Sequence, residues 1–356
     1  MMRRQTHQYI ERSTRRVRTE QLHGDKIVCA LYAEALEHAP WLCRIASSAW
    51  VSSALAFLNY DLLLGARATG TWLFLRDGAV DLSECVDPPH KLDTPRKVFE
   101  RQIRYWECRP LPKLSSTVVC PADSRAMVGS LRETSHLYVK GKFFEYEELL
   151  GSDRHCWLRV FNKGDFAIFR LTPEKYHYTH APVSGKVLDI YEIHGNYHSC
   201  NPGVAVSLIT PHSKNRRVVT ILETDVSGGT GVGRVAIIEV VALMIGQIHQ
   251  CYSTEQYRSP QPVRPGLFLE RGQPKSLFRP GSSTVILLFQ PGRIRFAEDV
   301  LDNLHRSGVE SRFSRGFGQT LVETDVEVRS LLAYSNRLDD TVAATITDEK
   351  EIIYDK

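Results

Sequence analysis

Two histidines and one glycine–serine pair are the residues of this sequence whose types and spacing best suit chemistry. His177 and His180 stand three positions apart in the segment YHYTH, and an imidazole ring can exchange protons near neutral pH. In the segment PGSST, Ser282 directly follows Gly281 and stands just ahead of the apolar run TVILLF. A serine hydroxyl is a weak nucleophile that a nearby base can activate. The ordinary alternative for PGSST is a turn before a buried strand.

Asp123 is a second candidate, because it follows the apolar run VVC in the segment VVCPADSR. An aspartate at the end of a strand can orient a catalytic histidine, although an aspartate in such a place is also a common turn former. His177 and His180 could instead share one face of a helical turn and bind a metal ion. No third ligand stands nearby in the sequence, so we expect no metal site.

The segment from Gly231 to Ala236 superficially matches a dinucleotide-binding fingerprint. That fingerprint requires its glycines to open a helix. Here the run RVAIIEVVALMIG follows, which is rich in β-branched residues and interrupted by Glu239. We therefore predict a strand, a glycine turn and a second strand, and no nucleotide site.

Composition indicates a soluble globular protein, with 42% hydrophobic and 24% charged residues in a chain of 356. The net charge of +4 does not demand nucleic acid as a partner, but it would suit an anionic membrane surface. The eight cysteines include no CxxC pair, which argues against a zinc knuckle. We expect mostly buried thiols in a reducing compartment.

The N-terminal part divides into a basic arm, residues 1–24, and a helical lead region, residues 25–110. Residues 1–20 hold six arginines and two glutamates, which predicts a disordered, solvated arm or, as the alternative, a contact with acidic lipid headgroups. In residues 25–68 we expect two helices separated by Pro40. Their longest uncharged run, IASSAWVSSALAFLNY, is too short to span a membrane, which requires about 20 residues, and indicates a buried or interfacial helix. Another helix is predicted from the Thr-Pro start of TPRKVFERQIRYWE.

From about residue 116 the pattern becomes β-rich, which favours an α+β fold whose catalytic core, residues 111–330, is mostly antiparallel and sandwich-like. Helices are expected in FEYEELLG and FAEDVLDNLHRSG. Residues 331–356 are predicted to be a polar peripheral tail. The expected strands are STVVC, HLYVKG, CWLRVFN, FAIFRL, GKVLDIYEI, GVAVSLIT, RRVVTILET, RVAIIEVVALMIGQI, STVILLF and RIRF.

In combination and in this order, the motifs resemble the phosphatidylserine decarboxylase family over about residues 95–325. PADSR resembles its Pro-Ala-Asp-Gly segment, YHYTHAPVSGKV its Tyr-His-x-x-His-x-Pro-x-x-Gly block, and PGSSTVILLF its Gly-Ser-Thr or Gly-Ser-Ser site. Three departures are Ser124 in place of a common glycine, Pro280 in place of a small or apolar residue, and a second hydroxyl at Ser283.

The resemblance implies a proenzyme that cuts itself between Gly281 and Ser282 into a β chain, residues 1–281, and an α chain, residues 282–356. Ser282 would become a covalent pyruvoyl group, with no metal or diffusible cofactor. His180 aligns with the base of this reaction. Asp123 aligns with the aspartate that holds that histidine in its useful tautomer.

The resemblance further implies decarboxylation through a Schiff base with the substrate amine. His177 is the first candidate for the acid that reprotonates the product, and His180 is the second. The implied reaction converts phosphatidylserine into phosphatidylethanolamine and carbon dioxide. The protein would lie peripherally on the cytoplasmic face of an anionic membrane without a transmembrane span, with its own cleaved chains and a second copy as partners and no nucleic acid.

Two alternatives stay open at this point. Related soluble enzymes decarboxylate free amino acids such as tryptophan, and the chain would then be cytoplasmic. A non-catalytic homologue would serve as a binding or scaffold protein, but the presence of Asp123, His180 and Ser282 together argues against that interpretation.

Overall fold

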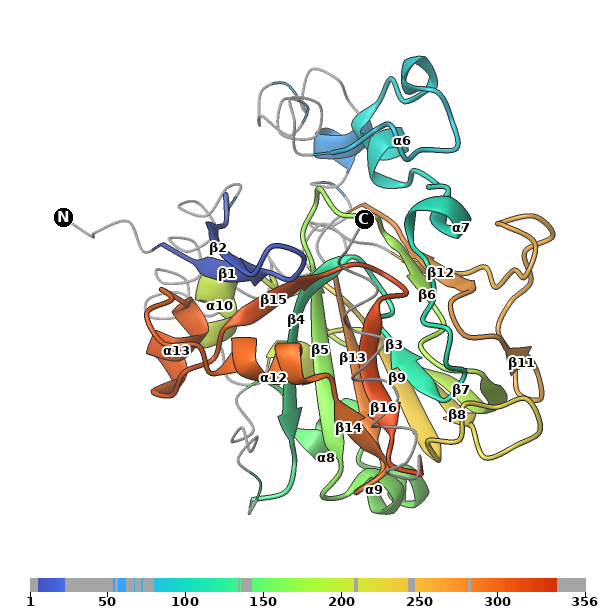
Figure 1. Ribbon diagram of the computed structural model, residues 1–356. Coiled ribbons are helices and arrows are strands. Elements are labelled where there is room, and N and C mark those ends of the chain that lie inside the picture. Colours follow the sequence, from blue (N-terminus) through green and yellow to red (C-terminus); the bar gives the residue numbers. More distant parts are fainter. Residues whose placement is uncertain are drawn as a thin grey trace.

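A computed structural model gives the fold (Figure 1). It describes residues 6–22, 54, 57–61, 67, 72, 80–133, 135, 143–207, 211–242, 247–280 and 283–337. Most of the predicted helical segment 25–68 lies outside these residues, as do the predicted strand HLYVKG, the Gly281–Ser282 pair and residues 338–356.

The centre of the fold is a ten-stranded sheet in the order β11-β7-β8-β9-β13-β5-β4-β15-β1-β2. Every neighbouring pair in it is antiparallel except β1 and β15, which run parallel. The strands are β1 (Gln8–Glu11), β2 (Arg16–Thr19), β4 (Ser124–Ser130), β5 (Asp165–Leu171), β7 (Gly185–Ile193), β8 (Arg217–Glu223), β9 (Arg234–Val241), β11 (Phe268–Leu269), β13 (Ser283–Phe289) and β15 (Glu323–Val326).

Two three-stranded antiparallel sheets complete the β structure. One has the order β10-β12-β6 and the other the order β14-β16-β3. Their strands are β3 (Thr117–Val119), β6 (Tyr178–His180), β10 (Ile248–Gln250), β12 (Pro274–Phe278), β14 (Ile294–Phe296) and β16 (Leu331–Ser335). The predicted α+β class with a mostly antiparallel core is therefore confirmed.

The helices among the described residues are short. They are η1 (Phe57–Asp61), η2 (Pro89–Lys91), α6 (Pro95–Phe99), α7 (Tyr105–Cys108), α8 (Tyr146–Leu150), α9 (His155–Phe161), α10 (Pro202–Ser207), α11 (Pro211–Lys214), α12 (Glu298–Leu304) and α13 (Arg312–Phe317). Figure 1 shows α6 and α7 at the end of the large sheet where β5 ends and β13 begins, and α8 and α9 at the opposite end.

Strand β13 lies at the centre of the large sheet, between β5 and β9. Its run STVILLF is buried along its whole length, as expected for a strand covered on both faces. In the register of the sheet, Ser283 stands opposite Leu171 on one side and Val241 on the other. The start of β13 is therefore held on both sides by strand pairing.

Two predicted strands are helices. In α9 the hydrophobic residues of the core and those packed against it are Trp157, Leu158, Val160 and Phe161, which lie on one side of the helix. The segment GVAVSLIT contributes to α10, where Asn201 accepts a hydrogen bond from the backbone N–H of Gly203 and Pro202 occupies the first turn. An asparagine followed by proline is a helix-start signal, so β-branched content misled the prediction here.

The predicted helix over residues 94–107 is broken into α6 and α7. Thr94 caps α6 as expected, because its side chain accepts a hydrogen bond from the backbone N–H of Lys97. Between the helices, Ile103 forms an antiparallel bridge with Cys85, and the N–H of Arg104 donates to the carbonyl of Glu84. This pairing holds the backbone in an extended conformation that a helix cannot share.

The prediction of a disordered, solvated N-terminal arm is wrong for residues 8–19, which form a β-hairpin at the edge of the large sheet. His7 and Ile10 are buried, and Arg12 bonds Asp299 at 2.6 Å. Strand β2 remains exposed, so part of the arginine charge stays at the surface. Likewise, the predicted polar tail contributes β16, which pairs with β3 and β14.

The predicted strand–glycine turn–strand arrangement is confirmed by β8 and β9, which pair as antiparallel neighbours. Gly231 and Gly233 between them have φ values of 77° and 74°. Such positive φ values favour glycine. These glycines therefore shape a hairpin loop and do not open a helix.

Candidate active site

The predicted cleavage site falls in the sequence between two described strands, β12 and β13, that belong to different sheets; residues 279–282 are called the link. The preceding strand β12 belongs to a three-stranded sheet and ends at Phe278, whereas β13 begins at Ser283 in the middle of the large sheet. Both ends of the link are fixed, since the N–H of Phe278 donates to the carbonyl of His177 at 3.1 Å and Ser283 is paired on both sides. The predicted scissile bond thus falls where the chain crosses between sheets.

His177 is paired through its backbone with Phe278, shortly before this link, and its imidazole ring is fully buried. Its ring stacks on Phe99 with 3.6 Å between the ring centroids. The backbone groups of Thr172 and Pro173 act to raise the pKa of this ring. Even so, neither ring nitrogen makes a hydrogen bond of normal geometry within the described residues. Burial, aided by the charge of Arg101, lowers the pKa of His177 to about 3. The ring is therefore neutral, and neither nitrogen is committed to a normal hydrogen bond among the described residues.

His180 is also fully buried, but both of its ring nitrogens have partners. Nδ1 lies 2.8 Å from the carbonyl oxygen of Gly272, and Nε2 lies 2.9 Å from the hydroxyl of Tyr176. The ring edge also meets Tyr105, with 4.8 Å between centroids. Burial lowers the pKa of His180 to about 3. In the β6–β12 register His180 stands opposite Pro274, whereas His177 lies at the level of Phe278, nearer the link.

Asp123 is buried and bound to an arginine. Its carboxylate is bonded by Arg109 at 3.0 Å and accepts the backbone N–H of Val328 at 2.7 Å, while Arg109 also bonds Glu84. Burial opposes ionisation, but the charge and hydrogen bonds of Arg109 outweigh it and lower the pKa of Asp123.

The expected direct contact between Asp123 and His180 is not present in the structure. Nδ1 of His180 bonds the carbonyl of Gly272, and the carboxylate of Asp123 is taken by Arg109, because a buried carboxylate requires a compensating charge. The two residues remain close enough for the charge of Asp123 to affect the histidine. A role for Asp123 in self-cleavage therefore stays a prediction.

The Asp123–Arg109 pair gives a prediction for stability. In an uncut Ser282→Ala chain, Asp123→Asn should lower the free energy of unfolding by about 3 kcal/mol at pH 7, since it deprives a buried arginine of a counter-charge. Folding depresses the pKa of Asp123 from its ordinary value of 3.8, so the stabilisation exists above that pH and is lost as the pH falls through the folded value. Urea unfolding of the two chains at pH 7 and pH 3 measures this difference. Equal stability at pH 7 would contradict it.

One segment, residues 99–109, contacts the three predicted site residues that the structure describes. It supplies Phe99 to His177, Tyr105 to His180 and Arg109 to Asp123. It also supplies Glu100, which bonds Arg279 of the link at 2.7 Å. The sequence motifs do not reveal these partners, because their residue types are common in any helical segment.

A buried ion pair, which the sequence did not predict, connects β12 of a three-stranded sheet with β9 of the large sheet. Lys275 on β12 and Glu239 on β9 are both fully buried, with 2.7 Å between Nζ and Oε2. Gln250 bonds both groups, and Thr179, which stands between His177 and His180, donates to Glu239 at 2.9 Å. The sequence did carry a signal for this ion pair, because each of the two apolar segments contains a charged residue. The network fixes β6 and β12 against the large sheet.

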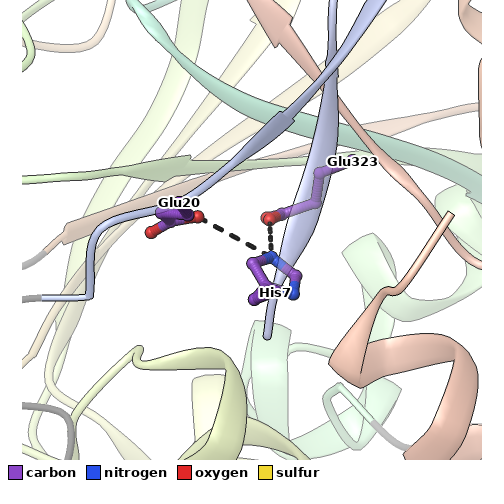
Figure 2. Close-up of side chains that lie close together, drawn as sticks. All are labelled: His7, Glu20 and Glu323. Carbon is purple, nitrogen blue, oxygen red and sulfur yellow. Dashed lines mark hydrogen bonds and ion pairs between the residues drawn. The ribbon is translucent and has the colours of Figure 1, made fainter. Parts of the chain in front are cut away.

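Figure 2 shows a separate group, His7, Glu20 and Glu323, whose ligand atoms lie close enough together to hold a metal ion. His7 bonds Glu323 at 2.8 Å. Arg170, however, bonds Glu20 at 2.6 Å and Glu323 at 2.5 Å, so it already occupies the carboxylates that a metal would need. The group anchors the N-terminal hairpin to the large sheet.

The helices among the described residues have at most seven residues each. Within that part of the chain, no helix combines the length and the apolar character needed to cross a bilayer.

The sequence of this chain is similar to those of known phosphatidylserine decarboxylase proenzymes. The sequence profile of that family matches residues 96–313. A phosphatidylserine decarboxylase proenzyme 2 of Oryza sativa subsp. japonica is 33% identical over 246 residues, which are 68% of this chain and 36% of that protein, so the chain spans only about a third of this relative. A phosphatidylserine decarboxylase proenzyme of Chlamydia trachomatis is 30% identical over 68% of this chain and 74% of its own length. One of Fusobacterium nucleatum is 25% identical over 87% and 95%.

Proposed function

Because the chain belongs to the phosphatidylserine decarboxylase family, we propose that it is a proenzyme that cuts itself between Gly281 and Ser282 and then decarboxylates phosphatidylserine. The observation that carries this proposal is the position of the Gly281–Ser282 link. It joins two sheets next to the pairing of Phe278 with His177, whose ring nitrogens have no normal hydrogen bond among the described residues, and it lies within the segment that matches the family.

In the proposed cleavage, the hydroxyl of Ser282 attacks the carbonyl carbon of Gly281, and the peptide bond is replaced by an ester. Elimination of the ester then leaves a Gly281 carboxylate, and hydrolysis with loss of ammonia leaves a pyruvoyl group at the new N-terminus. His180 is the proposed base, supported by its neutral ring and by the contact of Nδ1 with the carbonyl oxygen of Gly272, which leaves Nε2 as the acceptor nitrogen. Glycine before the serine tolerates the distorted backbone that this attack requires.

The two products should stay together after cleavage, because their strands alternate in the sheets. Within the large sheet, β13 of the proposed α chain pairs with β5 and β9, and β15 pairs with β4 and β1. Strand β16 pairs with β3. Each of these partners belongs to the proposed β chain, so backbone hydrogen bonds and core packing hold the two chains without a covalent link.

The pyruvoyl carbonyl, once formed, supplies an electron sink for the departing carbon dioxide. The unsatisfied ring nitrogens of His177, buried beside Phe278, fit a site that exchanges protons with this group. We assign His177 as the residue that returns a proton to the product, with His180 as the alternative. A substrate carboxylate near His177 would raise its pKa, because an opposite charge favours the protonated ring.

We assign phosphatidylserine as the substrate and a peripheral position on the cytoplasmic face of an anionic membrane. Exposed Arg16 and Arg18 on β2 supply positive charge, and Phe57 and Leu58 of η1 are 54% and 46% exposed. Basic and apolar side chains at a surface are the combination that binds anionic lipid. A homodimer is part of the same proposal and rests on the family alone.

A carbon dioxide assay tests the substrate. The purified chain should release carbon dioxide from liposomes that contain phosphatidylserine and none from free serine or free tryptophan, because the proposed surface docks on lipid. The Ser282→Ala chain, which cannot form the pyruvoyl group, is the matched control and should release none from either source. Release from a free amino acid alone would overturn the lipid assignment.

A further inference from the structure

Arg329 is a buried arginine that bonds no acidic side chain among the described residues. It lies in the turn between β15 and β16, with 9% of its surface exposed. Its side chain makes one hydrogen bond there, from Nη1 to the backbone carbonyl of Tyr105 at 3.3 Å, and its guanidinium lies 4.8 Å from the centroid of the Tyr105 ring. A buried charge is costly unless a counter-charge or hydrogen bonds compensate it. The protein therefore compensates this charge only in part.

One edge of the Arg329 guanidinium is unoccupied. Nε is buried without a hydrogen-bond partner, and Nη2 has none in the part of the chain that the structure describes. The N–H groups of Nε and Nη2 form one side of the planar group, and such a fork binds two oxygens of a phosphate or a carboxylate at once. Nη1, which bonds the carbonyl of Tyr105, lies outside this fork. The free edge is therefore the one suited to a bidentate anion.

Arg217 shows how this fold treats a buried arginine with a structural role. It is 2% exposed, and Nε, Nη1 and Nη2 each donate to a backbone carbonyl, those of Leu149, Asn215 and Glu148. Arg329 has a partner for only one of these three nitrogens within the described residues. The difference indicates that Arg329 keeps donors for a group that the protein itself does not supply.

The backbone at Arg329 is held in a strained conformation. Its φ is 70°, in the left-handed region that disfavours a residue with a side chain. The N–H of Arg329 donates to the carbonyl of Cys120 at 2.8 Å, and that of Val328 donates to the carboxylate of Asp123 at 2.7 Å. These bonds impose the conformation and with it the position of the guanidinium. Strain of this kind persists at sites where the placement of a side chain matters.

The groups around Arg329 add no negative charge at neutral pH. Those that act most on it are three tyrosines and one cysteine, namely Tyr105, Tyr176, Tyr257 and Cys108. Burial raises the pKa of each of these groups, so they stay protonated. Asp123 is close in the fold, but Arg109 bonds its carboxylate. A second arginine, Arg271, adds positive charge that reaches Arg329.

Arg329 lies close to His180, the proposed base. It lies over the ring of Tyr105, and His180 packs against the same ring in a T-shaped contact with 4.8 Å between the ring centroids. Burial is the main cause of the low pKa of His180, and the charge of Arg329 contributes to it. Trp106 and Tyr257 of this aromatic cluster are only partly buried, so the cluster reaches the surface.

We propose that the free edge of Arg329 binds the phosphodiester group of the lipid headgroup. This inference deepens the proposed function and rests on it. The headgroup of phosphatidylserine also carries a carboxylate, but that group loses its charge as carbon dioxide leaves. An arginine bound to the carboxylate would stabilise the substrate more than the transition state and slow the reaction. The phosphodiester keeps its charge throughout, so Arg329 can hold it without opposing the chemistry.

Steady-state kinetics of the mature protein test this role on vesicles in which the mole fraction of phosphatidylserine in phosphatidylcholine is varied. Arg329→Gln should raise KM about 10-fold or more and change kcat less than about threefold, because a group held equally before and during the reaction affects KM. Arg329→Lys should raise KM about threefold, since lysine keeps the charge but not the fork. A merely structural role would not separate KM from kcat in this way.

Arg295 provides a matched control. It is an exposed arginine of the same proposed α chain, and its guanidinium lies 5.8 Å from the centroid of the Tyr334 ring. Arg295→Gln removes the same charge and should leave KM near the wild-type value. Thermal melting and self-cleavage control for folding. All three variants should cut like the wild type, because no anion takes part in that step.

Soluble headgroups separate the phosphodiester from the carboxylate and from the bilayer. Glycerophosphoethanolamine has a phosphodiester and no carboxylate. It should compete with phosphatidylserine on the wild type and about 10-fold more weakly on Arg329→Gln, because the fork is lost. Free serine has a carboxylate and no phosphate, and it should affect the two proteins equally.

An unchanged KM in Arg329→Gln, a loss confined to kcat, or an equal rise of KM in Arg295→Gln would overturn the inference while leaving the proposed function intact. Competition by free serine that depends on Arg329 would assign the fork to the carboxylate, and competition by inorganic phosphate alone would assign it to free phosphate. If Arg329→Gln lost its cooperative melting, an unchanged KM in Arg329→Lys would be decisive against the inference. A wild-type chain that never cuts would instead overturn the proposed function.

Discussion

A Ser282→Ala chain should remain uncut, whereas a Ser283→Ala chain should still separate into two pieces. The proposed attack needs a hydroxyl on the residue that follows Gly281, and alanine at position 282 has none. The expected effect is complete, because the same hydroxyl is both the nucleophile and the source of the pyruvoyl group. Denaturing gels of the two purified variants measure the outcome.

Ser283 is the natural control because it offers a second hydroxyl one position later. It begins β13 and is fully buried, with Leu171 and Val241 opposite it in the sheet. Its hydroxyl has no hydrogen-bond partner among the described residues, so alanine should cost little stability. Cutting of the Ser282→Ala chain, or no cutting of the Ser283→Ala chain, would move the nucleophile to another residue.

Glutamine at the two histidines should separate cleavage from decarboxylation. His180→Gln should slow self-cleavage at least about 100-fold, because glutamine cannot serve as the base. His177→Gln should cut normally, yet the mature protein should release carbon dioxide from phosphatidylserine liposomes about 100-fold more slowly or worse, because its proton donor is missing. Gel densitometry measures the first rate and trapped carbon dioxide the second.

The geometry explains why the two histidines should differ. In the part of the chain that the structure describes, neither ring nitrogen of His177 has a normal hydrogen bond, whereas both ring nitrogens of His180 are bonded. Thermal melting of each variant controls for folding, since His177 also stacks on Phe99. If His177→Gln failed to cut and His180→Gln cut normally, the two assignments would have to be exchanged.

The sequence pattern predicted the parts of the fold that local periodicity determines. The apolar runs of β5, β8, β9 and β13 are strands, as expected from their β-branched content. The helices α9 and α10 contain the same residue types, but packing on one face and a start at Asn201–Pro202 determined their conformation. Composition alone therefore could not separate buried strands from short amphipathic helices.

The candidate site was only partly predictable, because its motifs are local and the partners of those motifs are distant. His177 and His180 lie in one short segment, so the pair could be recognised from the sequence alone. Arg109, Gly272 and Tyr257 reach the site from other parts of the chain, and their residue types carry no local signal of that role. The predicted contact between Asp123 and His180 was therefore replaced by contacts that only the tertiary structure reveals.

The N-terminal hairpin shows the same limit for charged residues. An arginine-rich start predicts solvation when the compensating groups are unknown. In the structure Glu20 bonds Arg170, which lies 150 positions away, and Arg170 also bonds Glu323. Parallel pairing of β1 with β15 then makes the hairpin part of the sheet.

The intact mass of the purified wild-type protein tests the central claim most directly. Self-cleavage predicts two masses, one for a chain that ends in a free carboxylate at Gly281 and one for residues 282–356. The second mass should be lower, by one ammonia, than that of the same peptide with an N-terminal serine, because a pyruvoyl group replaces that residue. A single mass for the uncut chain would contradict the account.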